Sequence, residues 1–95
     1  MTFITSSYTI FRFRFADTVP PCKFFVGDGV GGTETQIATT DNREQCAALV
    51  YNRYPTANGA TYSNNNDTKC YAEFGATGNN GNILWQTCLF RSKFF

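Results

Sequence analysis

The four cysteines of this 95-residue chain constrain its fold more than any other feature. They are Cys22, Cys46, Cys70 and Cys88. A domain of this length buries only about 60–65% of the surface that its unfolded chain exposes, so its core is thin and gains from cross-links. Zinc ligands usually come in pairs about two to four residues apart, whereas these cysteines are widely spaced and the chain has no His. We therefore expect two disulfides rather than free thiols or a metal site, with all three pairings left open by the spacing.

Residues 7–15 predict a β-strand with one apolar face, because side chains of opposite character alternate along them. The apolar face carries the self-association candidates Phe11, Phe13 and Phe15. A row of three Phe needs burial, either in the domain's own sheet or against the sheet edge of a neighbouring copy. We treat residues 1–21 as a segment of their own, a candidate assembly arm, that precedes a domain at 22–95.

Residues 41–54 predict a helix. Asp41 is a suitable N-cap, and Glu44 three residues later completes a box-like capping pattern. Apolar residues then recur at helical spacing from Cys46 onward, and Pro55 ends the helix. Since the apolar stripe carries a cysteine, we expect the helix to pack on a sheet to which Cys46 is bonded.

Four short segments are typical of strands, namely 22–26, 60–63, 69–74 and 83–90. Between them, the glycine-rich segment 27–32 and the segment 77–82 are expected to be loops. One helix and several antiparallel strands predict an α+β domain, in which the helix packs on an antiparallel β-sheet. In 69–74, Cys70, Ala72 and Phe74 alternate with Tyr71 and Glu73, which assigns the two sets to opposite faces.

These features together resemble the PAN/apple domain superfamily. The resemblance runs from Cys22 to Phe90 and rests on a helix with an inward cysteine, the segments 58–62 and 70–74, and a last strand with Trp85 and Cys88. It implies the bridges Cys46–Cys70 and Cys22–Cys88. Apple domains often carry a third bridge, which this chain lacks, and residues 1–19 have no counterpart in the family's core pattern.

The sequence gives no sign of an active site. The commonest general base is absent because there is no His, and oxidised cysteines offer no thiolate. Helix capping accounts for Asp41 and Glu44. A paired-carboxylate site would need two of the remaining acids to converge, and nothing in the sequence indicates that any do. The remaining acids are Asp17, Asp28, Glu34, Asp67 and Glu73. We therefore expect no enzyme activity, no cofactor and no metal.

Several features favour export from the cell. Charged residues make up only 16% of the chain and the net charge is +1, which excludes the basic footprint of a nucleic-acid-binding protein. No apolar run is long enough for a membrane span. Asn66 begins a glycosylation sequon in a polar loop. Arg12 and Arg14 interrupt what would be the core of a secretory signal, so no signal peptide is visible and we expect a mature or engineered fragment.

The candidate ligand-binding residues are Tyr62, Tyr71, Glu73 and Trp85. By parity, Tyr71, Glu73 and Trp85 are expected on the sheet face opposite the helix, while the facing of Tyr62 is undetermined. Aromatic rings beside amides and carboxylates suit sugars, although they also suit shielding of a thin sheet. We expect a secreted, non-catalytic module that mediates adhesion by binding an extracellular protein or glycan. The alternatives are a structural subunit that forms a homo-oligomer or filament by strand addition, and a small inhibitor or toxin.

Overall fold

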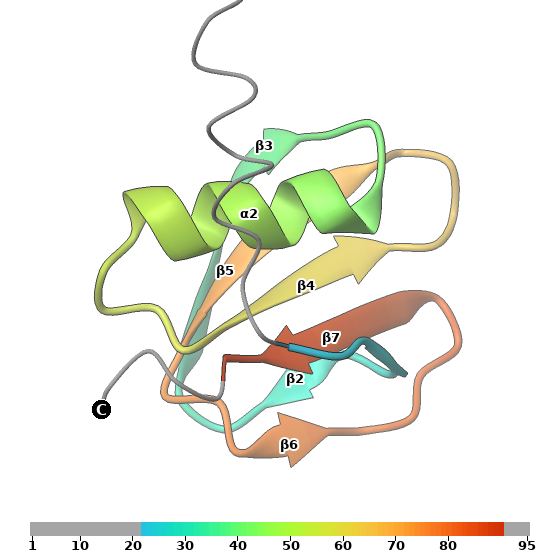
Figure 1. Ribbon diagram of the computed structural model, residues 1–95. Helices are drawn as coiled ribbons and strands as arrows, with labels where there is room; N and C mark the ends of the chain where they lie inside the picture. Colours follow the sequence, from blue (N-terminus) through green and yellow to red (C-terminus); the bar gives the residue numbers. More distant parts are fainter. Residues whose placement is uncertain (1–21, 91–95) are drawn as a thin grey trace, which may run out of the picture.

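The computed structural model describes residues 22–90. Seven strands and one helix follow one another along this part of the chain. Their bounds are β1 Phe25–Val26, β2 Gly29–Val30, β3 Thr33–Thr39, α2 Arg43–Arg53, β4 Gly59–Ser63, β5 Lys69–Phe74, β6 Gly78–Asn79 and β7 Trp85–Leu89. The result is the expected α+β fold, with a helix on an antiparallel sheet (Figure 1).

Five strands form the main sheet in the order β1-β7-β4-β5-β3, with every neighbouring pair antiparallel. The helix α2 crosses one face of this sheet and packs on β4 and β5 (Figure 1). In the described part of the chain, the strands β2 and β6 pair only with each other, through Gly29 with Asn79 and Val30 with Gly78. We call this two-stranded element the ribbon.

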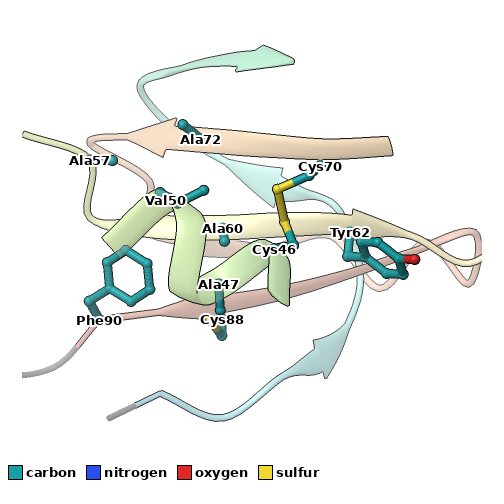
Figure 2. Close-up of a cluster of buried hydrophobic side chains, with 10 residues drawn as sticks. All are labelled: Cys46, Ala47, Val50, Ala57, Ala60, Tyr62, Cys70, Ala72, Cys88 and Phe90. Carbon is teal, nitrogen blue, oxygen red and sulfur yellow. A yellow bond between two sulfur atoms is a disulfide. The ribbon is translucent and has the colours of Figure 1, made fainter. Parts of the chain in front are cut away.

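The two disulfides are Cys22–Cys88 and Cys46–Cys70, the pairing that the resemblance implied. Figure 2 shows the second bridge joining α2 to β5 across the core. The buried cluster contains several small side chains, so the helix lies close to the sheet. Its members are Cys46, Ala47, Val50, Ala57, Ala60, Tyr62, Cys70, Ala72, Cys88 and Phe90. Because alanines bury little apolar area, the bridges carry a large share of the stability.

The helix begins one residue later than the sequence predicted. Asn42, not Asp41, is the N-cap, and its side-chain oxygen accepts a hydrogen bond from the backbone N–H of Gln45 at 2.8 Å. The Gln45 side chain in turn accepts from the backbone N–H of Asp41 at 3.0 Å. Asn and Asp are equally good caps. Glu44 instead forms an exposed ion pair with Arg43.

Three other expectations need correction. Residues 33–39 form the strand β3, for which the sequence offered no prediction. The segments 27–32 and 77–82, expected to be loops, contain the two short strands of the ribbon. The strands expected at 22–26 and 83–90 are shorter than predicted, because only β1 and β7 are paired within them.

Candidate functional site

The candidate site lies on the face of the main sheet that points away from α2, which we call the outer face. Cys70 and Ala72 of β5 belong to the core beneath the helix, so the alternating Tyr71 and Glu73 point outward. The same parity in β7 places Trp85 on the outer face. The predicted sidedness of these three candidates is therefore confirmed by the strand geometry.

Tyr71 and Trp85 form an aromatic pair on the outer face. Their ring centroids lie 5.4 Å apart and the ring planes meet at 83°, an edge-to-face contact. The pair spans β4, whose outward residues opposite Tyr71 and Trp85 are Thr61 and Ser63. These small side chains leave room for rings from the two flanking strands to meet. Both rings are half-buried, so part of each remains open to a ligand.

Apolar and amide groups continue the surface beside Trp85. Ile83 and Leu84, which precede Trp85 in the chain, are 77% and 47% exposed. The backbone carbonyls of both accept hydrogen bonds from Asn64, at 3.1 Å from its side chain and 2.8 Å from its backbone N–H. Across from Tyr71, the exposed Gln36 of β3 adds another amide. The local surface thus combines aromatic and aliphatic groups with amides.

Tyr62 does not belong to this surface. It alternates with Thr61 and Ser63 and so lies on the helix side, where it is only 8% exposed. Its hydroxyl donates to the backbone carbonyl of Thr40 at 2.9 Å. Tyr62 is therefore a core residue that joins β4 to the segment preceding α2. It no longer belongs to the candidate ligand-binding residues.

Glu73 points to the outer face but is buried there, at 1% exposed. The ribbon covers it, since a Cβ atom at Gly29 would lie only 2.6 Å from its carboxyl group. The hydroxyl of Thr61 donates to the carboxylate at 2.5 Å, and the hydroxyl oxygens of Thr61 and Thr87 lie 2.8 Å apart. Glu73 is thus held in a polar layer under the ribbon, rather than being free to bind a ligand as predicted.

Two more acids join Glu73, contrary to the expectation from the sequence. One carboxylate oxygen from each of Asp28, Glu34 and Glu73 lies within 4.8 Å of the others. Glu34 and Glu73 are direct partners in the β3–β5 pairing, and the backbone of Asp28 is tied to Asn80 by two hydrogen bonds of 3.0 Å. We call these three residues the carboxyl cluster.

Two acids of the carboxyl cluster, Glu34 and Asp28, have raised pKa values and hold their protons more tightly than isolated carboxyl groups do. Partial desolvation of its carboxyl group, followed by the hydrogen bond and charge of Glu73, raises the pKa of Glu34 to about 7, although the side chain as a whole is exposed. Burial and then the charge of Glu34 raise the pKa of Asp28 as well. Within residues 22–90, no Lys or Arg forms an ion pair with the cluster. Clusters of acidic side chains are common without a bound ion, and we assign no metal here.

The remaining candidates fall elsewhere. Asn66 is exposed in the turn between β4 and β5, with a φ angle of 70°. Phe11, Phe13 and Phe15 lie outside the described residues. A groove of about 560 Å³ lies between β1, β7 and the ribbon strand β6, with Phe25, Val26, Leu89 and Asn79 in its lining.

Comparisons with known proteins assign no family. No family model, no curated protein and no solved structure matches this chain. Within the described part of the chain, no helix combines the length and the apolar character needed to cross a bilayer.

Proposed function

We propose that this chain is an extracellular, non-catalytic binding module whose ligand contacts the aromatic pair on the outer face. The observation that carries the proposal is the placement of Tyr71 and Trp85, held in mutual contact yet half-open, beside exposed aliphatic and amide groups. Such a surface suits a glycan, because aromatic rings cover the apolar face of a sugar while amides bond its hydroxyls. Two disulfides in so small a domain support an oxidising, extracellular setting.

Glycan-array binding of the folded chain tests this proposal. Trp85→Ala should abolish the signal, whereas Phe25→Ala should preserve it. Phe25 is a matched control, since it is 55% exposed but lies at the β1 edge rather than beside the aromatic pair. If the wild-type chain binds no glycan, the carbohydrate version fails. If a glycan binds equally to wild type and Trp85→Ala, the aromatic pair is not its site.

A second candidate function is self-assembly, and the two sheet edges favour it. The edge strand β3 has seven residues and, among residues 22–90, pairs only with β5. At the other edge, Phe25 and Val26 are more than half exposed beside the groove. Exposed edges of this kind accept an added strand from another chain.

Light scattering over a concentration series tests self-assembly. Full-length chain should increase in mass with concentration, and a variant in which Phe11, Phe13 and Phe15 are all Ser should stay monomeric. A wild-type chain that is monomeric throughout would eliminate the assembly hypothesis. Equal growth of both chains would show that the Phe-rich segment is not the assembly element.

A further inference from the structure

The ribbon covers only part of the outer face, next to the aromatic pair. It lies over Glu73, two residues further along β5 than Tyr71. The segment that leads into the ribbon is bonded to β7 at Gly27. The backbone N–H of Gly27 donates to the carbonyl of Trp85 at 2.7 Å. The carbonyl of Gly27 accepts a hydrogen bond of 2.8 Å from the Thr87 hydroxyl. A backbone hydrogen bond therefore joins the segment that leads into the ribbon to Trp85 of the aromatic pair.

The ribbon itself is weakly built. Each of its strands has only two residues, and Val30 is 38% exposed rather than packed into a core. Glycines with positive φ lie on both sides of each strand, at 27 and 31 around β2 and at 75 and 81 around β6. A short ribbon with little apolar burial belongs to the low-stability parts of a protein, which open locally without global unfolding.

In the described part of the chain, the ionisable side chains that meet beneath the ribbon are all acidic. Asp28 enters from the turn that leads into β2, Glu34 from β3 and Glu73 from β5. The strands β4 and β7 contribute only the hydroxyl groups of Thr61 and Thr87. The amide of Asn79 on β6 lies beside Gly27. Lys23 points instead toward the ring of Phe25, 5.6 Å from its centroid.

Such a cluster stays together only if it shares protons. A protonated carboxyl donates a hydrogen bond to its neighbour, while adjacent carboxylates repel one another in a poorly solvated space. Asp28 belongs to the loop that opens the ribbon, whereas Glu34 and Glu73 are fixed by the pairing of two long strands. Repulsion within the cluster therefore acts to push the ribbon away from the main sheet.

We propose that the ribbon is a proton-operated cover of the outer face, which stays closed while the carboxyl cluster holds its protons and lifts when the cluster is fully ionised. Glu34 is the group that senses the solvent, because it is exposed at the β3 edge while Glu73 is buried. Lifting the ribbon exposes Glu73, Thr61 and Thr87 beside the aromatic pair, and so enlarges the polar part of the outer face.

Because the pKa values of Glu34 and Asp28 are raised, we expect the ribbon to open at a higher pH than ordinary carboxyl groups would set. Below a pH of about 7 Glu34 keeps its proton and the cover is closed. Above that value Glu34 loses its proton and the cover opens. The device thus closes in mildly acidic surroundings and opens at neutral to basic pH.

Amide hydrogen exchange by NMR tests the proposal without any ligand, so its outcome is independent of the proposed binding function. The reporters are the N–H groups of Thr77 and Asn80, which donate within the ribbon to the carbonyls of Val30 and Asp28 at 2.8 and 3.0 Å. They should lose protection when the ribbon lifts, because two short strands without a sheet beneath them are only marginally stable. Their protection factors should fall by about tenfold or more between about pH 5.5 and about pH 8.5. The N–H of Phe90, which donates to Asn58 in the core, should stay protected. EDTA in all samples prevents a divalent cation from neutralising the cluster.

Glu34→Gln should strongly reduce this pH-dependent loss of protection, because it removes the sensing carboxyl. Glu44→Gln, which removes an acid at the distant helix start, should leave the loss unchanged. If Glu34→Gln fails to fold, Asp28→Asn carries the same expectation. Protection of Thr77 and Asn80 that does not change with pH in the wild type would overturn the proposal, as would an undiminished change in Glu34→Gln.

Discussion

Replacing Glu34 by Gln should flatten the dependence of global stability on pH between about pH 5 and about pH 8. In the folded chain, burial and the neighbouring Glu73 raise the pKa of Glu34 from its ordinary value of 4.5 to about 7. Between these two values the folded state holds a proton that the unfolded state has lost. Stability from this group is therefore complete at low pH and is lost as the pH rises toward 7.

The size of the effect follows from this difference in pKa, reduced for the exposure of the side chain. Glu34 lies at an open sheet edge, where water screens its interactions. We therefore expect wild type to lose about 1 kcal/mol of unfolding free energy from Glu34 across this range, rather than the full value for a buried group. Glu34→Gln should lack this loss, and part of the remaining slope should come from Asp28, whose pKa is also raised.

Urea unfolding with both disulfides intact, at several pH values, measures the slope. Glu44→Gln is the control with the opposite sign, because the hydrogen bond from Arg43 lowers the pKa of Glu44. The stability that Glu44 contributes is present above its ordinary pKa and lost in acid, so this variant should keep the wild-type slope above pH 5. If Glu34→Gln shows the same slope as wild type, the acids do not share protons in the folded state.

Two further predictions concern the bridge and the helix cap. Replacing both Cys46 and Cys70 by Ala should lower the unfolding free energy by about 3.5 kcal/mol, since the bridge closes a loop with a sequence separation of 24. Thermal unfolding measures this loss. A loss below about 1 kcal/mol would contradict the argument that the bridge acts by constraining the unfolded chain. Asn42→Ala should cost about 1 kcal/mol in urea unfolding because it removes the cap. Asp41→Ala should cost clearly less, and the reverse order would restore Asp41 as the cap.

Local patterns determined the elements that have one buried face. In residues 69–74 the period-two alternation predicted both the strand and its sidedness, and the structure has β5 with these bounds. The helix around Cys46 could be predicted equally well, because apolar residues recur at helical spacing on its buried face. The N-cap was not decided in this way, since Asp41 and Asn42 are chemically equivalent caps and the turn through Thr40 selects the second.

Elements without a buried face left no such pattern. The first four residues of β3 are all exposed, so no apolar alternation could reveal it, although its Thr residues gave a weak β signal. The ribbon is likewise too short and too rich in Gly and Asn to be distinguished from loops. These strands exist because pairing with β5, or with each other, satisfies their backbone groups.

The carboxyl cluster was decided by tertiary structure alone. Glu73 is far along the chain from Asp28 and Glu34, and each of the three looks like an ordinary surface acid by itself. The antiparallel register of β3 and β5 sets Glu34 opposite Glu73, and the ribbon folds Asp28 over both. The sequence by itself thus determined a disulfide-stapled α+β domain with an aromatic outer face. Which acids meet there, and which of them is buried, depended on strand register, because register is a property of two segments together.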